Sequence, residues 1–534
     1  MTFLASALQA EREQRWIEAL DLCLGAVAET PEDPDVLNLL GRLCARAGDV
    51  SQALATQGFA LYLNPNHEPA SRDLDALLST DPRDPATAQE KFTQATLLAP
   101  EIANHQRSPV SLVPFAGMDR VERLLRDSIA LSCSEARVHA ALGNVLSRRQ
   151  QRVAAIVEYA IAVRSDPTFT EAHVALGSLF EAQHNEARAA LHWNQAMQRR
   201  QLYPAAIYPS TTIRVLVLAV PGAADKNTPL DFFVNPYTTA LHTLYLVPGS
   251  PIPKPLPEYD VIFTAIEEAE ASSEAIALAA DFIKRQDRPV VNDPAHIENT
   301  RRSVLPQALA GIRGCIVPQT VRLSRDALTD VADNAVDVAG IVFPLLVRPI
   351  DTHSGIGLAL VSDAAELHAY ISKRNESSFN LSPFVDYRSA DGYFRKYRVV
   401  VVDSVPYPYH LAISERWMVH YNNSDMKLHP WMRDEEAGFL ANPRSVLDRW
   451  DDVFAAIAAP VGLDYFAVDF TVLQDGSVLV FECGGGMFVH CQDDMELFPY
   501  KYRYVPRIFD AFDAMLARYA RTPSRSSGSG RGGS

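Results

Sequence analysis

The chain of 534 residues lacks any uninterrupted apolar run of the roughly 20 residues that a membrane-spanning helix requires. Its N-terminus lacks the basic segment that opens a secretory signal peptide, and Glu11, Arg12 and Glu13 soon interrupt the first apolar stretch. These absences argue against a membrane or secreted protein. We therefore expect a cytoplasmic protein without a membrane partner.

Paired cysteines are also missing. The six cysteines are scattered, and no two of them form a C-x-x-C pair. This spacing suits neither a zinc ribbon nor a disulfide framework, so we expect reduced thiols, as in a cytoplasm. The six are Cys23, Cys44, Cys133, Cys315, Cys483 and Cys491.

The chain has fewer basic than acidic residues. Lysine and arginine number 49 against 65 aspartates and glutamates, which gives a net charge of -16. A nucleic-acid partner is therefore not expected, because phosphate backbones bind to cationic surfaces. A local basic pocket for ATP or for a substrate carboxylate remains compatible with this balance, since net charge does not describe one cleft.

Alanine and leucine dominate the chain up to about residue 205, with apolar residues spaced three and four apart. The spacing predicts amphipathic helices, separated by breaks that contain proline, such as Pro31 and Pro34. One apolar stripe runs through Trp16, Ile17, Leu20, Leu24 and Val27.

These helices repeat. The pairs Leu142-Gly143 and Leu176-Gly177 are 34 residues apart, and Leu40-Gly41 precedes the first of them by 102, three times that period. Asn64-Pro65 and Asp166-Pro167 are also 102 apart. The period and its Gly, Ala and Pro positions resemble the tetratricopeptide repeat (TPR). The segments 35–67, 135–167 and 169–201 show the pattern, the stretch 79–117 interrupts it, and a generic helical bundle is the alternative.

The pattern changes near residue 205. Three β-branched apolar runs, at Ile213–Val220, Tyr259–Ile266 and Pro289–Asn292, predict buried strands, with a helix at Ile276–Ile283 between the last two. Strands that alternate with helices predict an α/β domain with a parallel sheet. The proline-rich segment Pro248–Pro257 is expected to be a surface connection.

Beyond residue 340 the strands are expected to be antiparallel neighbours. The turn Gln474-Asp475-Gly476 is a strong hairpin signal, because Asp-Gly supports positive φ angles. The last residues, Pro523–Ser534, are rich in Ser, Gly and Arg and predict a disordered tail. The predicted strands are Phe343–Pro349, Leu358–Val361, Arg398–Val402, Tyr407–Ser414, Tyr465–Leu473 and Ser477–Glu482.

Two stretches suggest chemistry. In the first, Arg348 ends a strand and a loop with Gly355 and Gly357 follows, so the backbone can approach phosphate oxygens while the guanidinium neutralises their charge. An ordinary hairpin loop is the alternative. In the second, Asp469 and Glu482 stand among apolar residues on adjacent strands, where an unpaired carboxylate is costly. Such a pair suits Mg²⁺, and two acids that merely lie near turns are the alternative.

Together these features resemble the ATP-grasp family over roughly residues 213–518. In that resemblance Asp469 and Glu482 bind Mg²⁺, while Arg398 and Arg348 are the catalytic cations that face the phosphates or the acyl intermediate. The nucleotide is held by a basic residue of the preceding domain, the glycine loop and a hinge: Arg302, Arg348, His353, Ser354, Gly355, Gly357, Phe384, Val385 and Asp386.

Three positions depart from the family pattern. Arginine replaces the usual lysine at Arg348 and at Arg302, and its planar fork binds phosphate differently. The usual asparagine two residues after the metal-binding glutamate is Gly484, which removes one side-chain ligand. The run Gly484-Gly485-Gly486 instead offers backbone N–H groups that suit a phosphate or an oxyanion.

The resemblance implies a multidomain fold: a TPR-like all-α repeat domain at 1–205, an α/β pre-ATP-grasp domain at 206–310, an α+β ATP-grasp domain at 311–520 and a disordered tail at 521–534. It also implies an ADP-forming carboxylate–amine ligase that uses ATP and Mg²⁺ and proceeds through an acyl phosphate. The alternatives are a nucleotide-binding scaffold without turnover, or a phosphotransferase.

Substrate and partners follow from position and analogy. His410, Arg416 and His420 follow the basic strand and are predicted to hold a substrate carboxylate, with an exposed loop as the alternative. The helical repeats are expected to recruit a peptide or protein, because such arrays offer concave surfaces for extended segments. The small-molecule acid and amine are undetermined, and a homodimer is left open.

Overall fold

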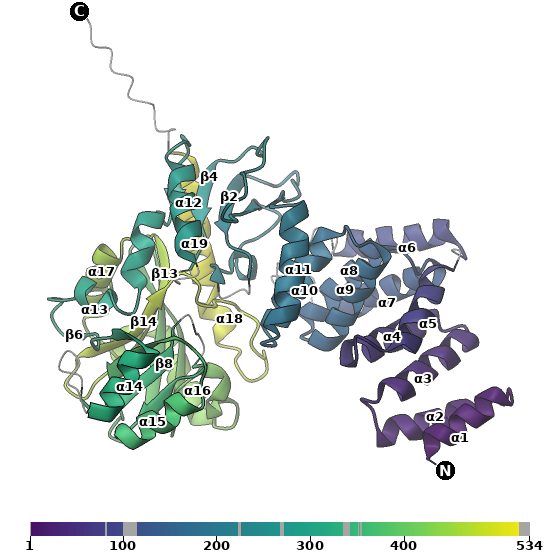
Figure 1. The fold of residues 1–534 in the computed structure, drawn as a ribbon. Coiled ribbons are helices and arrows are strands. Elements are labelled where there is room, and N and C mark those ends of the chain that lie inside the picture. The colour runs from purple at the N-terminus through teal and green to yellow at the C-terminus, as the bar shows by residue number, and fades with distance from the viewer. Residues whose placement is uncertain are drawn as a thin grey trace, which may run out of the picture. The chain divides into compact units, whose positions relative to one another are not determined.

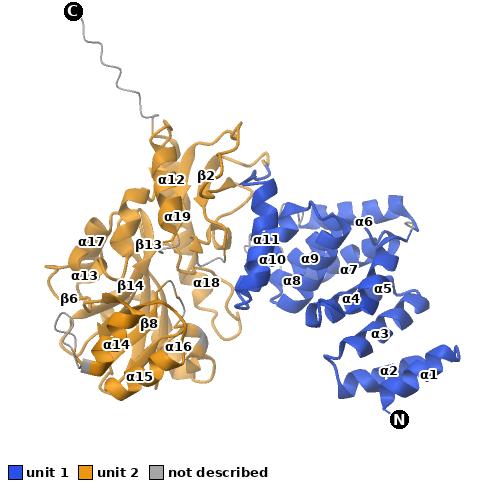
Figure 2. Ribbon diagram, viewed as in Figure 1, with its two compact units in different colours: residues 1–206 blue, residues 207–534 orange. Residues whose placement is uncertain are grey.

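The computed structural model describes residues 2–80, 83–99, 115–222, 226–267, 272–334, 342–350, 352 and 355–522. The chain forms two compact units, residues 1–206 and 207–534 (Figure 2). Of the predicted tail at 521–534, only Arg521 and Thr522 fall within the described residues. Among the helices described, none is long and apolar enough to cross a membrane.

The first unit consists of helices and one terminal two-residue strand (Figure 1). Its elements are α1 Phe3–Arg12, α2 Trp16–Glu29, α3 Pro34–Ala47, α4 Val50–Leu63, α5 Glu68–Leu78, α6 Pro85–Leu98, α7 Phe115–Leu131, α8 Ala136–Arg148, α9 Arg152–Ser165, α10 Thr170–Glu181, α11 Glu186–Arg199 and β1 Leu202–Tyr203. Local signals set their ends. In α3, Asp33 caps the first turn, Pro34 opens the helix, and Gly48 ends it at a φ of 86°.

The glycines of the repeated Leu-Gly pairs lie where two helices approach each other closely. A Cβ atom at Gly41 would lie 2.5 Å from the Gln57 side chain, one at Gly143 would lie 2.7 Å from Tyr159, and one at Gly177 would lie 2.9 Å from Trp193. Each contact spans 16 residues, from the first helix of a pair to the second. The helical pairs are therefore as the sequence predicts, and glycine stands where the two helices of a pair approach closely.

The repeats do not form a simple row. Helices α4 and α9, whose bounds are 102 residues apart, pack against each other: a Cβ at Gly58 would lie 2.5 Å from Cγ1 of Val157. Beside this contact, Arg164 of α9 pairs with Asp75 of α5 at 2.6 Å. In a linear solenoid each repeat contacts only its neighbours. The interval of 102 residues therefore does not correspond to three repeats stacked in line.

The second unit contains a parallel sheet, an antiparallel sheet and a third sheet that is antiparallel except for one parallel pair at its edge. Its strands are β2 Ile213–Ala219, β3 Thr239–Tyr245, β4 Val261–Thr264, β5 Val290–Val291, β6 Cys315–Ile316, β7 Val321–Ser324, β8 Leu345–Pro349, β9 Ala359–Val361, β10 Ser378–Pro383, β11 Phe394–Val402, β12 Val405–Ser414, β13 Tyr465–Val472 and β14 Val478–Gly484. Its α-helices are α12 Ser273–Ile283, α13 Leu305–Ala308, α14 Arg325–Asn334, α15 Ala364–Ser372, α16 Pro430–Ala441, α17 Trp450–Val461, α18 Lys501–Tyr504 and α19 Pro506–Ala520.

The parallel sheet has the order β3-β2-β4-β5 within this unit, with every pair parallel. The predicted strands at 213–220, 259–266 and 289–292 are confirmed, together with the helix near 276–283. Strand β3 was not predicted. Its sequence, Thr239–Tyr245, places Thr and His between its apolar residues, which weakens the apolar signal although most of the strand is buried.

The antiparallel strands form two sheets, which corrects the expectation of one neighbouring set. The larger sheet has the order β12-β11-β13-β14-β6, in which β6 joins β14 in parallel. The segment predicted at 343–349 is β8, and it belongs instead to a smaller sheet of order β7-β10-β8-β9. Strand β8 pairs with β10 and with β9, which places it in the smaller sheet. Apolar periodicity predicts that a segment is a strand but does not specify the strands with which it pairs.

The larger sheet is packed on both faces. One face shares a core with α16 and α17, to which Trp450, Phe454 and Phe470 contribute. The opposite face packs toward the parallel sheet and α19 (Figure 1). Phe263, Phe512 and Tyr465 contribute to that core. The smaller sheet forms a separate core with α14 and α15. The second unit thus places three sheets around the residues described next.

Candidate functional site

Four predicted site residues lie in one row across the larger sheet. Arg398 of β11 pairs in register with His410 of β12 on one side and with Asp469 of β13 on the other, and Asp469 pairs with Glu482 of β14. The pairing is interrupted by a register shift beside Arg398 and another beside Asp469. Such irregularities re-aim side chains and are frequent next to active sites.

Asp469 is completely buried between two cations. Its Oδ2 accepts a hydrogen bond from Lys396 Nζ at 2.8 Å and one from an Arg398 guanidinium nitrogen at 2.9 Å. Burial raises the pKa of Asp469, but the charges of Arg398 and Lys396 outweigh it and hold the pKa well below its usual range. For Arg398, burial lowers the pKa, and the Asp469 carboxylate reverses this to a net increase. The aspartate is therefore ionised and its charge is compensated.

Glu482 forms an ion pair with Arg302, which reaches it from the segment after the parallel sheet. Burial raises the pKa of Glu482, but the positive charges of Arg302, Lys396 and Arg348 exceed that effect and hold the pKa at about 2. Three predicted site residues, Arg302, Arg348 and Glu482, are thus close enough to influence one another electrostatically.

Arg348 is the penultimate residue of β8, and its guanidinium bonds to the following loop. Its Nε donates to Thr352 Oγ1 at 3.2 Å, and a terminal nitrogen donates to the Thr352 carbonyl oxygen. Burial, with a further contribution from the charge of Arg302, lowers the pKa of Arg348 to about 9. A half-buried guanidinium with few anionic partners is suited to receive a phosphate, which would compensate its charge.

The glycine loop lies against the segment predicted to bind substrate. Gly355 and Gly357 have φ angles of 75° and 69°, a region that strongly favours glycine. A Cβ at Gly355 would lie 2.7 Å from His420 Nε2 and 3.3 Å from Met418 Sδ. The other two predicted residues of this loop, His353 and Ser354, lie outside the described residues.

The predicted hinge directly follows β10. The N–H of Phe384 donates to the Pro344 carbonyl at 3.0 Å, and the Phe384 ring packs edge-on against Trp417 at 5.8 Å. Val385 belongs to the same apolar cluster as Trp417. Asp386 is exposed and pairs with Arg388 at 3.1 Å, so its side chain lies apart from the charged row.

The three predicted substrate residues have different surroundings. His410 is buried, its Nε2 has no hydrogen-bond partner among the described residues, and burial lowers its pKa well below the usual value. His420 is partly buried beside Gly355, and burial lowers its pKa also. Arg416 instead lines a surface pocket of about 460 Å³ next to Trp417, beside the hinge. Two of the three predicted residues, His410 and His420, therefore lie near the charged row.

Sequence reasoning missed a buried polar cluster beside His410. Glu436 is completely buried, accepts hydrogen bonds from Tyr421 at 3.0 Å and Tyr500 at 2.6 Å, and lies 3.5 Å from the Lys501 amine. Burial raises the pKa of Glu436. Glu436 and Tyr500 are 64 residues apart in the chain. No local sequence pattern therefore predicts this cluster.

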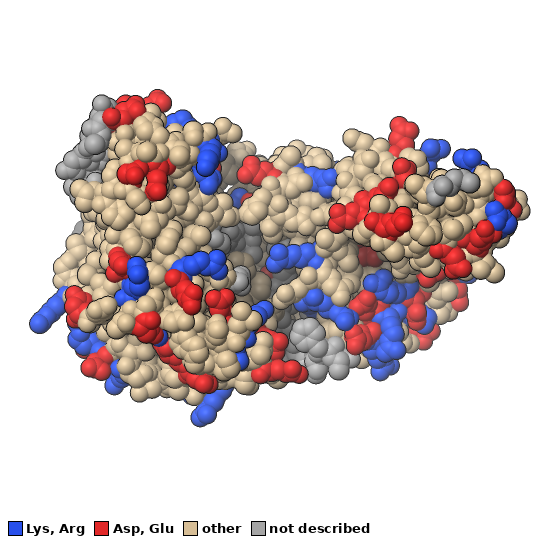
Figure 3. All heavy atoms as spheres, turned by 90° about the horizontal axis from the view of Figure 1, so that it is seen from below, with Lys and Arg blue, Asp and Glu red and all other residues tan. Residues whose placement is uncertain are grey.

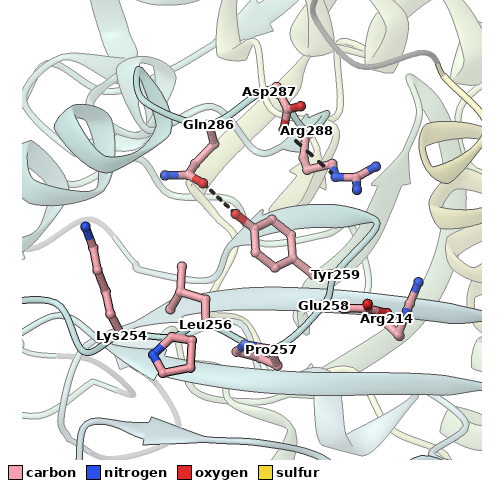
Figure 4. Close-up of a pocket in the computed structure, with 10 residues that line it drawn as sticks. Arg214, Lys254, Leu256, Pro257, Glu258, Tyr259, Gln286, Asp287 and Arg288 are labelled. Carbon is pink, nitrogen blue, oxygen red and sulfur yellow. Dashed lines mark hydrogen bonds and ion pairs between the residues drawn. The ribbon is translucent and has the colours of Figure 1, made fainter.

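A different hollow, of about 960 Å³, lies at the amino ends of β2, β4 and β5 (Figure 4). There Tyr259 points toward Gln286 and donates to its Oε1 at 2.6 Å. Arg214 is already paired with Asp260 at 3.1 Å. Open parallel sheets bind ligands at the carboxyl ends of their strands, so this hollow is at the end opposite to the expected one.

The residues present suit a divalent cation in a limited way. Asp469 and Glu482 are in-register neighbours on adjacent strands, and Mg²⁺ usually takes one or two carboxylates with water and phosphate oxygens. Within the described part of the chain, no three His, Cys, Asp or Glu side chains converge on one point. The pair therefore fits an ion that a nucleotide helps to hold, rather than an all-protein cage.

Acidic and basic side chains are interspersed on the face shown in Figure 3. The expectation of no nucleic-acid partner stays a prediction. The thiol of Cys483, next to Glu482, has a pKa raised well above its usual value by burial and by the charges of Glu267 and Glu482. It is thus a poor nucleophile, as its sequence neighbours suggest.

No family model and no curated protein matches the chain. Among solved structures it is similar to a RimK domain ATP-grasp protein from Sphaerobacter thermophilus, at 18% identity and a TM-score of 0.34 over 57% of this chain and 99% of that one. It is similar to the VanG D-Ala:D-Ser ligase from Enterococcus faecalis at 12% and 0.37, over 57% and 100%. The D-alanine-D-alanine ligase from Coxiella burnetii gives 12% and 0.38, over 58% and 96%. Such values are too low to establish function, which depends on the geometry of this chain.

Proposed function

We propose that the protein is an ATP-dependent, ADP-forming carboxylate–amine ligase. The observation that supports this most is the row Arg398–Asp469–Glu482, with Arg302 and Arg348 coupled electrostatically to Glu482. Phosphoryl transfer depends on positioning and on compensation of phosphate charge, and a row of two carboxylates with cations beside them supplies both.

Each cation has a distinct role in this proposal. Arg348, which has few anionic partners, receives the terminal phosphates together with the backbone around Gly355 and Gly357. Arg398 stabilises the acyl phosphate, because its position is fixed by two hydrogen bonds to Asp469. Arg302 holds Glu482 until nucleotide binds. A bound Mg²⁺ ion would neutralise phosphate charge beside Asp469 and Glu482.

The nucleotide base is proposed to lie at the hinge Phe384–Asp386, where Phe384 and Trp417 offer apolar surface. His420 and His410 are proposed to line the acceptor side, because one contacts the glycine loop and the other is next to Arg398 in the row. The unpartnered Nε2 of His410 suits a hydrogen bond to substrate. The His410 ring stacks on Tyr421 with 5.0 Å between centroids, and Tyr421 in turn packs against Phe498.

The helical unit is proposed to be a TPR-like module that recruits a peptide or protein substrate in the cytoplasm. Helical pairs with a 34-residue period and glycine at each close approach support this. Pull-down of peptides by the full chain, compared with Gly177→Trp, tests it. Loss of binding in the variant alone supports recruitment, whereas equal binding contradicts it. A homodimer stays a prediction for light scattering to decide.

The ligase is tested by ADP release from ATP with pairs of carboxylates and amines, including peptides. ADP that appears only with the right pair, with a product mass equal to the two substrates less water, supports the proposal. Glu482→Gln should abolish turnover, while Glu415→Gln, at an exposed glutamate of the same unit, should not. A product that gains phosphate would indicate a phosphotransferase instead.

A nucleotide-binding scaffold without turnover is the second candidate. Gly484, which supplies no side-chain ligand, and the full compensation of Asp469 by two cations favour it. Such a scaffold would bind ATP and its partner but release no ADP with any substrate pair, and Glu482→Gln would leave partner binding unchanged.

A further inference from the structure

His410 lies at one end of the charged row, on the edge strand β12 of the larger sheet. It pairs with Arg398, and the register shift beside this pair leaves Tyr409 as an extra residue on β12. Such a bulge re-aims the neighbouring side chains. Directly opposed residues of antiparallel strands face the same side of a sheet, so the imidazole lies on the side of the Arg398 guanidinium. Its Nε2 is buried and has no hydrogen-bond partner among the described residues.

A buried carboxylate of the neighbouring helix α16 fixes the backbone beside this histidine. The N–H of Leu411 donates to Oε1 of Glu436 at 3.2 Å. Because β12 is an edge strand, an N–H group that points away from β11 needs a partner outside the sheet. Glu436, which is completely buried, supplies that partner at the residue next to His410.

The same carboxylate also holds the ring against which His410 packs. Tyr421 stacks on His410 with an angle of 23° between the ring planes, and its hydroxyl donates to Oε2 of Glu436 at 3.0 Å. The Lys501 amine lies 3.8 Å from the centre of the Tyr421 ring and 3.5 Å from Oε1 of Glu436. Glu436 is therefore linked to His410 twice, once through the backbone of β12 and once through Tyr421.

The surroundings of His410 favour a neutral imidazole. The titratable and charged groups around it are Arg398 and Lys396 of β11, Tyr409 of β12, Asp469 of β13, Lys501 of α18 and Tyr421. Burial lowers the pKa of His410 most, and the three cations lower it further against the opposing effect of the Asp469 carboxylate. A neutral imidazole is a weak ligand for a carboxylate, but its unprotonated nitrogen can accept a proton. An amine therefore suits this position better than the carboxylate that the sequence predicts.

We propose that His410 is a catalytic residue, whose Nε2 takes the proton of the attacking amine. Glu436 is a positioning residue, which holds this imidazole through the Tyr421 ring and the β12 backbone. This inference rests on the proposed ligase function, and it assigns the amine to this end of the row.

The proton follows from the bonds that change. The nitrogen of the neutral amine bonds to the carbonyl carbon of the acyl phosphate, and the bond from that carbon to the phosphate oxygen breaks. The electron pair of the broken bond leaves with the phosphate. The nitrogen gives up one proton to Nε2 of His410, which later passes it to the released phosphate.

The two half-reactions can be measured separately with the full-length chain, Mg²⁺ and ATP labelled with heavy oxygen. Exchange of the label between bridging and non-bridging positions of ATP reports acyl phosphate formation, and product mass reports amide formation. The probes are amino acids and dipeptides, offered in pairs as acid and amine. His410→Gln should keep the exchange and slow amide formation roughly a hundredfold, which is within the range of general-base catalysis. Asp434→Asn, at an exposed position of α16, is the matched control for α16 and should behave as the wild type does.

A double variant tests the positioning role. Glu436→Gln should lower kcat for amide formation about tenfold through misplacement of the imidazole, at an unchanged KM for ATP. Because Glu436 acts through His410, the double variant His410→Gln/Glu436→Gln should be no slower than His410→Gln alone. Multiplied losses in the double variant overturn the positioning role. If Glu436→Gln does not fold, Tyr421→Phe takes its place in the same comparison, because it keeps the stacked ring and removes only the hydroxyl.

The outcomes separate this inference from the proposed function. Amide formation at the wild-type rate in His410→Gln overturns the inference and leaves the proposed function standing. Equal loss of oxygen exchange and amide formation in that variant also overturns it, because His410 would then act in acyl phosphate formation. A wild type that forms no amide with any pair overturns the inference and the proposed function together.

Discussion

The two units differ in how their buried polar groups are paired. In the helical unit, three pairs of polar side chains join the two helices of one repeat, each pair 19 residues apart: Asn38 with Gln57 at 3.0 Å, His139 with Glu158 at 2.8 Å and His173 with His192 at 2.9 Å. In the second unit, charged groups from four separate segments converge on one row of the sheet. Local pairs stabilise a repeat, whereas the convergent row gathers three cations around two carboxylates, and an anionic ligand can use this excess of positive charge.

The largest effect is expected when a charged residue in the row across the larger sheet is replaced. Asp469→Asn leaves Lys396 and Arg398 without their carboxylate in a buried position, and the loss of one partner of a buried pair costs about 3–5 kcal/mol. Denaturant unfolding should show this loss of stability, together with loss of nucleotide binding.

Asp403→Asn is the matched control for that variant. Asp403 pairs with Arg518 in the same unit, but both side chains are about half exposed, at 48% and 53%. An exposed pair contributes about 0–1 kcal/mol, so this change should be nearly silent. Equal losses in the two variants would contradict the contrast between compensated surface charge and the buried row.

A smaller loss is expected from filling a close approach in the helical unit. A Cβ at Gly143 would lie 2.7 Å from Tyr159, which is buried and whose hydroxyl is held by Asn144 at 2.7 Å, so the ring cannot easily move. Gly143→Ala gains about 1 kcal/mol of helix propensity, but overpacking costs about 1–3 kcal/mol. We expect a net loss of about 1 kcal/mol, seen as faster amide exchange in α8 and α9.

The second change Tyr159→Leu should relieve that loss, because it removes the ring that the new methyl group meets. A Gly143→Ala variant as protected as the wild type would show that the helices can separate without penalty. It would then remove the physical reason for the repeated Leu-Gly pairs.

The difference between local and distant partners also explains which features of the fold and site the sequence could predict. Helical pairs, the glycine contacts and strands β2, β4, β13 and β14 follow from local periodicity and turn residues. Asp469 and Glu482 were identified because charges stand out within apolar strands. The Glu436–Lys501 pair was missed because its two members lie 65 residues apart in the chain, where only the fold brings them together.

A pH-dependent effect is expected at Asp513 of α19, whose Oδ1 is buried without a hydrogen-bond partner among the described residues. Burial, with a smaller contribution from Asp510, raises its pKa from 3.8 to about 6. The folded state then binds more protons than the unfolded state between these values, so stability falls as the pH rises from about 4 to 6.

Asp513→Asn removes that penalty. The variant should be more stable than the wild type by about 1 kcal/mol at pH 7, after allowance for solvent screening, and equal to it below pH 4. Asp510→Asn, at an exposed position of the same helix, should give a much smaller difference. Unfolding curves at the two pH values measure both, and a gain that is independent of pH would exclude ionisation as its cause.

The smallest effect is expected at a helical glycine that no other side chain approaches. Gly438 of α16 is exposed, and a Cβ there would meet no atom within 4 Å, unlike the Cβ at Gly143. Gly438→Ala should therefore stabilise the second unit by about 0.5–1 kcal/mol, because alanine loses less backbone entropy in a helix. Slower amide exchange across Pro430–Ala441 would show it. Loss of stability in both glycine variants would mean that the backbone, rather than the facing side chain, requires glycine.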